Sequence, residues 1–335
     1  MAVRDASDWD PGPCLRRHLD ALVGERSPSG EGAGLRRAEE YVARVFEGAG
    51  LIVLREPIGA AHDRWHNVLG DLPGDPPATR AAGGDGAGRP AVGTGGGLGG
   101  EAGRGDSLTD STGRGSPPPL FIVGGHIDAV EGSPGADDNA SGAAAMLALV
   151  ERMAAIPSSA RRVTLRFAGF NLEEWGMVGS QSHADGLAAA GRAVEGMISL
   201  EMLGYVGSPG ERQKYPPGIG LGRRKKPDFI SVVGDRRSRP LVREVAEALR
   251  SVDGLPVESI SLPGPLALLV GAALSDHASF WRHGIPAVMV GDTAFYRNPH
   301  YHAPSDGLES LSMPFLERVT RGLGRFLDAL VASRP

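Results

Sequence analysis

Two adjacent carboxylates, Glu173 and Glu174, stand where a predicted strand ends and a loop begins. The strand is indicated by the β-branched and aromatic residues of 163–167, which stop before Gly169. Because neighbouring side chains of an extended segment point in opposite directions, each carboxylate can face a different partner. An acidic pair at a strand end is more often simply solvated, but this arrangement also suits a metal ligand beside a general base.

Matching side chains follow other predicted strands, which favours the metal interpretation. With Glu174 they form a set of five: His126, Asp138, Glu174, Glu201 and His302. Imidazole and carboxylate oxygen are ligands that zinc accepts, although carboxylate-rich sites also take cobalt or manganese. One catalytic zinc needs about three protein ligands. Five therefore predict two Zn²⁺ per chain that share a bridging carboxylate, a pair able to activate water and polarise a carbonyl.

The elements that must position these side chains alternate along the chain. Apolar residues at helical spacing predict helices at about 15–23, 35–46, 143–155, 181–190, 241–252 and 313–331. Short apolar runs predict strands at 51–54, 66–70, 120–123, 163–167, 197–201, 228–233 and 285–290. This alternation indicates an α/β layer fold with a largely parallel sheet. Ligands in such folds gather at the carboxyl ends of strands, where the five residues lie.

Composition limits the other functional classes. The chain has 335 residues with 41% hydrophobic residues, and we expect one domain over 1–335. The formal net charge of −5 gives no indication of a nucleic-acid partner. Cys14 is the only cysteine, which excludes an intramolecular disulfide and a cysteine-rich zinc site. Without a signal-peptide pattern or an apolar run near the roughly 20 residues of a membrane span, we expect a cytoplasmic protein with no membrane partner.

One segment, at about residues 74–118, differs from the rest. It is dense in Gly, Pro, Asp, Ser and Thr and nearly lacks large apolar side chains. Such a segment buries too little surface to offset its ordering entropy, so we predict a disordered insertion between two strands. A phosphate-binding glycine loop is disfavoured because the sequence has no GxxxxGK[ST] motif.

The chain resembles the zinc aminopeptidases of metallopeptidase family twenty-eight, a group related to the glutaminyl cyclases. Five segments carry the resemblance: Gly-His-Ile-Asp at 125–128, Gly-Ala-Asp-Asp-Asn-Ala-Ser-Gly at 135–142, Asn-Leu-Glu-Glu-Trp-Gly at 171–176, Leu-Glu-Met at 200–202 and Tyr-His-Ala-Pro at 301–304. The resemblance implies a three-layer α/β/α fold with a central mixed, largely parallel sheet. It also implies hydrolysis of N-terminal residues from peptides, or from small amides with a free N-terminus, through a water bound by two zinc ions.

The resemblance implies one zinc held by His126 and Glu201 and a second held by Glu174 and His302. Many relatives have Asp at the position of Glu201, which leaves substrate choice open. Asp138 would bridge the two ions and would precede a cis peptide to Asn139. If the register slipped by one residue, Asp137 would be the ligand instead, and His300 is the alternative to His302.

Three further residues acquire roles from the resemblance. Glu173 would be the general base, and Tyr301 would donate its hydroxyl to the developing oxyanion. Asp128 would hydrogen-bond the second ring nitrogen of His126. Substrate preference would depend on loops at 207–224 and 262–274.

Two alternatives remain open from the sequence. A glutaminyl cyclase or another amide-processing enzyme could use the same scaffold, and the cyclase would hold one zinc. A catalytically inactive binding module could keep the fold. A serine hydrolase is disfavoured because Ser141 lacks the GxSxG context.

Overall fold

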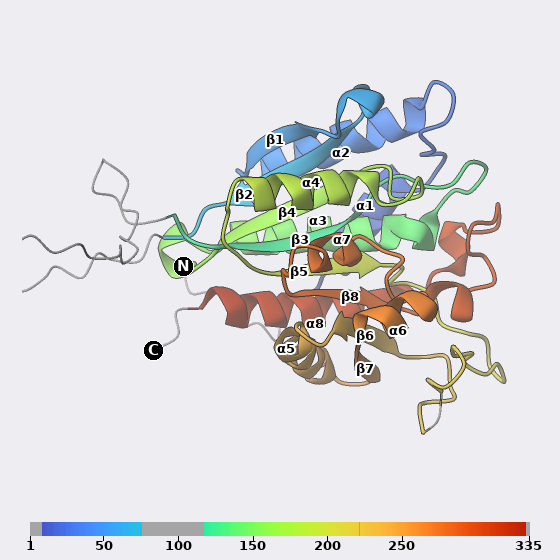
Figure 1. The fold of residues 1–335 in the computed structure, drawn as a ribbon. Helices are drawn as coiled ribbons and strands as arrows, with labels where there is room; N and C mark the ends of the chain where they lie inside the picture. Colours follow the sequence, from blue (N-terminus) through green and yellow to red (C-terminus); the bar gives the residue numbers. More distant parts are fainter. Residues whose placement is uncertain (1–8, 76–116, 221, 333–335) are drawn as a thin grey trace, which may run out of the picture.

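Eight strands form one sheet in a computed structural model that describes residues 9–75, 117–220 and 222–332. The order across the sheet is β1-β2-β4-β3-β5-β8-β6-β7 (Figure 1). The strands are β1 (Ile52–Pro57), β2 (His66–Leu72), β3 (Leu120–His126), β4 (Thr164–Phe170), β5 (Val194–Glu201), β6 (Ile230–Asp235), β7 (Val257–Leu262) and β8 (Ala287–Gly291). Strand β3 runs parallel to β4 and β5, β5 parallel to β8, and β6 parallel to β7, whereas β1/β2, β2/β4 and β6/β8 are antiparallel. The predicted mixed, largely parallel sheet is confirmed.

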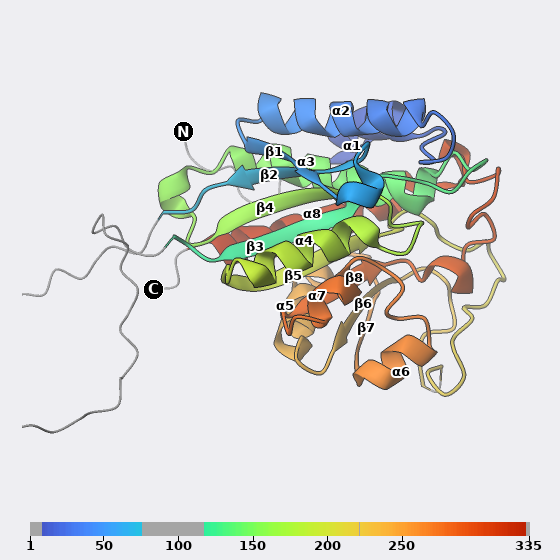
Figure 2. The ribbon, with the colours of Figure 1, turned by 45° about the horizontal axis from the view of Figure 1, so that its top comes forward.

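Helices cover both faces of this sheet (Figures 1 and 2). They are α1 (Gly12–Leu22), α2 (Ala33–Gly48), α3 (Gly142–Ala154), α4 (Val178–Ala189), α5 (Arg239–Arg250), α6 (Gly264–Leu269), α7 (His277–Trp281) and α8 (Met313–Val331). Helices α1, α2, α3, α5 and α8 pack with one another on one face. Helices α4 and α7 pack together on the other face, over β2, β5 and β8. These layers form the expected α/β/α arrangement.

The central strands explain why the sheet can hold a site at its edge. Every residue of β3 is buried, because helices cover both of its faces, and its sequence is accordingly a nearly continuous apolar run. In the parallel register His126 pairs with Phe170, so the end of β3 lies beside the end of β4. Strand β5 runs parallel to β3 on its other side and ends at Glu201. Three predicted site segments therefore leave the sheet side by side, at the carboxyl ends of β3, β4 and β5.

Three elements differ from expectation, and one of them is the short helix α7, where no element was predicted. Strand β7 was not predicted, because its sequence Val-Glu-Ser-Ile-Ser-Leu is neither a continuous apolar run nor a strict alternation, and it forms the sheet edge between two prolines. Helix α6 lies within 262–274, which was expected to be a loop. Residues 76–116 of the predicted insertion lie outside the described part of the chain. Among the described residues, no helix combines the length and apolar character required to cross a membrane.

Candidate metal centre

The five predicted ligands come together as two clusters that share Asp138. In the first, His126 Nε2 lies 3.3 Å from Asp138 Oδ1 and 3.5 Å from Glu201 Oε1. In the second, His302 Nε2 lies 3.3 Å from Asp138 Oδ2 and 3.1 Å from Glu174 Oε2. Each cluster offers three ligand atoms within 4.8 Å of one another, a spacing that could hold a metal ion.

Asp138 is fixed by the turn that leads into α3. Gly135 adopts φ 59°, and the Asp138–Asn139 peptide is cis, as expected. The Asn139 side chain donates to the Leu200 carbonyl at 2.8 Å and accepts from the Met202 amide at 3.0 Å. These two bonds join the Asp138 turn to the end of β5, which carries Glu201.

Asp306 holds the same turn from the opposite end of the chain. Its two carboxylate oxygens accept the backbone amides of Asp137 at 2.9 Å and Asp138 at 3.0 Å. Asp306 is fully buried, so these are protected hydrogen bonds. Sequence reasoning assigned Asp306 no role, because nothing local in the sequence indicates a contact with residues so distant in the chain.

Asp128 positions the Glu173–Glu174 segment. Its carboxylate accepts the backbone amides of Glu173 and Glu174, each at 3.2 Å. The predicted approach to His126 Nδ1 is also present, at 3.5 Å from Asp128 Oδ1. The hydrogen bond of Nδ1, however, is to the backbone carbonyl of Asp128 at 3.2 Å. Asp128 therefore contacts both the Glu173–Glu174 segment and His126, which belong to different clusters of the candidate centre.

Arg26 supports the loop behind the centre, and sequence reasoning missed it. Its buried guanidinium donates to the carbonyls of Ile127 at 3.0 Å and Gly135 at 2.8 Å. It also donates to the carbonyls of Leu22, Gly24 and Pro134. Burial lowers the pKa of Arg26 to about 10, so the group remains charged at neutral pH. The segments before and after Asp128 are thus joined to the end of α1.

Glu201 receives a hydrogen bond that the sequence did not predict. Ser275 Oγ donates to Glu201 Oε2 at 2.7 Å and lies 3.1 Å from Ser199 Oγ. The Glu201 Oε1 atom is the one that faces His126. One carboxylate oxygen is therefore held by the protein while the other faces the cluster.

The electrostatics of the clusters reflect closely packed histidines and carboxylates. Burial lowers the pKa of His302, but hydrogen bonds to Asp138 and Glu174 raise it to about 10. For Asp138 burial raises the pKa, yet His126 and His302 hold it below its usual range. The buried Glu174 Oε1 has no hydrogen-bond partner among the described residues. An imidazole–carboxylate donor set with such an unpartnered oxygen fits a cation such as zinc.

Glu173 and Tyr301 lie beside the clusters. A Glu173 carboxylate oxygen is within 4.8 Å of a ring nitrogen of His126 and a carboxylate oxygen of Glu174. Burial raises the pKa of Glu173 well above its ordinary range, and Glu201 and Asp276 add to this. Tyr301 and Glu201 line one pocket, and burial with nearby carboxylates raises the pKa of the Tyr301 phenol. Tyr301 therefore stays protonated and able to donate.

The competing candidates for ligation contact other groups. Asp137 accepts from Asn298 Nδ2 at 2.7 Å and from the Gly204 amide at 2.8 Å. His300 Nδ1 lies 2.9 Å from Ser305 Oγ on the surface. Neither residue belongs to a ligand cluster among the described residues. Trp175 stands in the turn that follows Glu174 and is 49% exposed.

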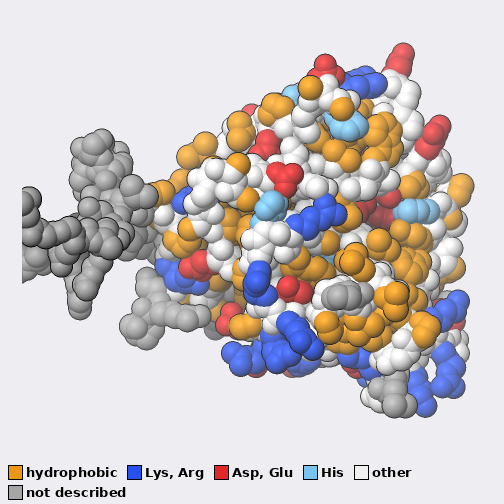
Figure 3. All heavy atoms as spheres, viewed as in Figure 1, with side chains coloured by type: hydrophobic (Ala, Val, Ile, Leu, Met, Phe, Trp, Pro, Cys, Tyr) orange, Lys and Arg blue, Asp and Glu red, His pale blue; other side chains and the backbone are white. Residues whose placement is uncertain are grey.

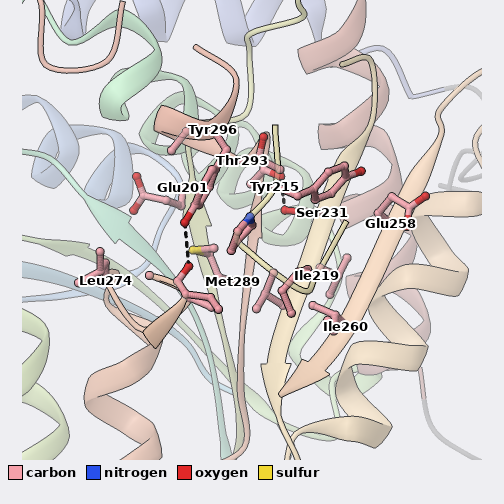
Figure 4. Close-up of a pocket in the computed structure, with 18 of the residues that line it drawn as sticks. Glu201, Tyr215, Ile219, Ser231, Glu258, Ile260, Leu274, Met289, Thr293 and Tyr296 are labelled. Carbon is pink, nitrogen blue, oxygen red and sulfur yellow. Dashed lines mark hydrogen bonds between the residues drawn. The ribbon is translucent and has the colours of Figure 1, made fainter. Parts of the chain in front are cut away.

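A largely apolar pocket opens beside the clusters (Figure 4). Its empty volume is about 980 Å³, open solvent at its mouth included. Residues from both segments predicted to shape it, 207–224 and 262–274, line its walls. Apolar pockets with a few polar groups on their walls commonly bind small organic groups.

Comparison with known proteins identifies the family. Residues 109–327 match Peptidase family M28. The chain is similar to the uncharacterized protein YfbL of Escherichia coli, with 36% identity over 216 residues that cover 61% of this chain and 65% of that protein. It is similar to a probable leucine aminopeptidase of Arthroderma benhamiae, with 29% identity over 65% of this chain and 56% of that protein.

The fold also has solved counterparts. The LapA aminopeptidase of Legionella pneumophila superposes with a TM-score of 0.71 at 16% identity, covering 99% of this chain and 75% of that chain. This likeness concerns the fold alone. The matched region spans between half and two thirds of the length of the two curated relatives. Because the family match covers well over half of the 335 residues, the chain belongs to Peptidase family M28.

Proposed function

We propose that this protein is a two-zinc aminopeptidase that removes the N-terminal residue of peptides or of small amides with a free N-terminus. The observation that carries the proposal is the position of Asp138, whose two oxygens each face a histidine at 3.3 Å. His126 and Glu201 would hold one ion, Glu174 and His302 the other, with Asp138 shared. When bound, such a pair supplies Lewis-acid chemistry, lowering the pKa of water and polarising a carbonyl.

Glu173 would move the proton. Its carboxylate lies beside His126 and Glu174, within reach of a water placed between the clusters. Its raised pKa favours accepting a proton from the attacking water and giving it to the departing amine. Asp128 holds the backbone of Glu173 and so fixes the position of this carboxylate.

Tyr301 would act on the carbonyl oxygen of the scissile amide. Its phenol is neutral and lies with Glu201 on the wall of the pocket, so it can donate to an oxygen that gains negative charge. Carboxylates at the same edge of the sheet would attract the protonated N-terminus of the substrate. This attraction favours removal of the first residue over cleavage within a chain.

A chelator experiment tests the proposal. Leucine p-nitroanilide is assayed with the purified protein, with protein treated with EDTA, and after zinc is restored. The proposal predicts chelator-sensitive release that zinc restores, with N-acetyl-leucine p-nitroanilide left intact as the matched blocked substrate. Release that resists the chelator, or equal hydrolysis of the blocked amide, would contradict it.

A further inference from the structure

The pocket beside the candidate centre runs across the sheet. Its floor includes a row of paired residues on four strands: Glu201 of β5 pairs with Gly291 of β8, Gly291 with Ser231 of β6, and Ser231 with Glu258 of β7. All four line the pocket, and Figure 4 shows Glu201 and Glu258 towards its two ends. Strands lie roughly 4.8 Å apart, so three steps separate the backbones of Glu201 and Glu258 by roughly 14 Å.

The middle of this row is open because its side chains are small. Gly291 has none, and a Cβ there would meet the Glu201 carbonyl oxygen at 2.5 Å. Ser231 is short, and its hydroxyl donates to the Gly291 carbonyl at 2.6 Å. The two residues that stand between Glu201 and Glu258 in this row are therefore both small. We call this passage the transverse channel.

The other surfaces of the transverse channel are apolar. The next row of the sheet contributes Met289, Val233 and Ile260, which pair across β8, β6 and β7 and also line the pocket. At the end near Glu201 the rim carries Leu274, which is 60% exposed, and Phe295, which is 44% exposed. Figure 3 shows hydrophobic side chains gathered on this face of the molecule. An apolar group loses less solvation than a polar one on entering such a channel.

The far end is bounded by an ion pair. Arg223 Nη1 lies 3.0 Å from Glu258 Oε2, and Arg223 Nε donates to the Ile219 carbonyl at 3.0 Å. Because Arg223 neutralises Glu258, this carboxylate is not free to attract a cationic side chain. Lys214 also lines the pocket, which further disfavours a cationic occupant. The channel thus favours a long apolar side chain over a charged one.

We infer that the transverse channel receives the side chain of the substrate's N-terminal residue and selects extended alkyl or arylalkyl groups longer than leucine. This inference rests on the proposed aminopeptidase function, which places the scissile bond beside Glu201. A leucine side chain fills only the near end of a floor that continues past Gly291 and Ser231 to β7. Longer apolar groups bury more surface along it and bind more tightly in the transition state.

A homologous substrate series tests this inference directly. The p-nitroanilides of norvaline, norleucine, 2-aminooctanoic acid and 2-aminodecanoic acid differ only in unbranched side-chain length. Each buried methylene is worth about fourfold in kcat/KM, so 2-aminooctanoyl should exceed norleucyl by roughly 15-fold. A plateau or a fall immediately after norleucine would overturn the inference.

A constricted variant provides a second test. Ile219 lies on the channel wall in Figure 4, on a loop outside the sheet and only partly buried, so Ile219→Trp narrows the passage without replacing a residue of a strand. We expect the ratio of 2-aminooctanoyl to norvalyl kcat/KM to fall at least tenfold. The control is Ile52→Trp on the exposed edge strand β1, which should keep the ratio. An unchanged ratio in Ile219→Trp would contradict the inference that the side chain of the substrate enters the transverse channel.

The experiments distinguish an error in the channel inference from an error in the proposed function. If leucyl and norleucyl amides are cleaved but longer ones are not, only the channel is wrong. If no amide is cleaved, the proposed function is wrong, and calorimetric binding of the free amino acids of the same series then decides the channel. Release of N-terminal dipeptides from longer peptides would also overturn it, because two residues would then occupy the passage.

Discussion

The Nε2 atoms of His126 and His302 face the two oxygens of one carboxylate, each 3.3 Å from Asp138. His126 ends β3, whereas His302 lies in the loop before α8, with φ 57°. The two rings therefore come from segments far apart in the chain and lie on either side of Asp138. This relationship divides the five candidate ligands into two sets of three that share one member.

Replacing the candidate base should separate chemistry from metal binding. Glu173→Gln keeps the size of the side chain but cannot accept the proton, so we expect kcat/KM to fall by about 10²–10⁴. Metal content should be unchanged, because Glu173 is not one of the five candidate ligands. Steady-state kinetics and metal analysis on the same preparation measure both quantities.

Glu131→Gln is the matched control, because Glu131 is exposed on the loop between β3 and α3. It should retain full activity. If Glu173→Gln retained activity as well, the assignment of the base would be wrong.

Asp128 should govern metal affinity through the backbone that it holds. Asp128→Asn replaces one of the two oxygens that accept the Glu173 and Glu174 amides with an NH₂ group, which faces an N–H unfavourably. We expect zinc to bind about 10–100-fold more weakly. Competition with a chromogenic chelator measures the change, with the exposed Asp20→Asn as control. Unaltered affinity would show that Glu174 is positioned without Asp128.

Arg26 should matter for stability. Its guanidinium donates to five carbonyls, and Arg26→Lys leaves several of these buried acceptors unpaired because an ammonium group has only three donors at one point. We expect the free energy of unfolding to fall by about 2–4 kcal/mol. Urea denaturation of this variant beside the exposed Arg37→Lys gives the comparison. Equal midpoints for the two variants would show that the hydrogen bonds of Arg26 do not stabilise the fold.

Glu39 should make stability depend on pH. Burial raises its pKa to about 7 in the folded protein, against about 4.5 unfolded, despite hydrogen bonds from the His66 amide and Asn171 side chain. The folded state holds the proton on Glu39 more tightly than the unfolded state does. The stabilisation that this proton gives the fold is therefore complete below pH 4.5 and is lost as the pH rises towards 7. We expect a loss of up to about 3 kcal/mol from this group.

The test compares unfolding free energies at pH 4.5 and 7 in two variants. Glu39→Gln should remove this part of the pH dependence, whereas Glu40→Gln, at the adjacent exposed position, should keep it. If both variants retained the same slope, Glu39 would not be the titrating group.

The positions of the ligands could be predicted because each follows a locally recognisable strand or turn. Strand β3 is a continuous apolar run that ends at His126, and the parallel register with β4 places the Glu173–Glu174 segment beside it. The layer arrangement followed from the alternation of the two kinds of element. These signals are local in sequence and therefore readable from it.

The supporting contacts could not be predicted, because they join segments that are remote in sequence. Asp306 holds the amides of the Asp138 turn, and Ser275 donates to Glu201. Neither residue has a local pattern that distinguishes it from an ordinary loop residue. Strand β7 was missed for a different reason, because its adjacent polar residues Glu258 and Ser259 break both the apolar run and the alternation that indicate a strand. The far half of the transverse channel depends on that strand.

The most direct test of the account is the number of metal ions that one chain binds. Metal-free protein is titrated with zinc by calorimetry, and the saturated, desalted product is analysed by mass spectrometry for metal content. We expect about two ions per chain, because Asp138 faces both His126 and His302. A limit of one ion would contradict the shared carboxylate and favour chemistry of the glutaminyl cyclase type on this scaffold, and no bound ion would indicate an inactive module.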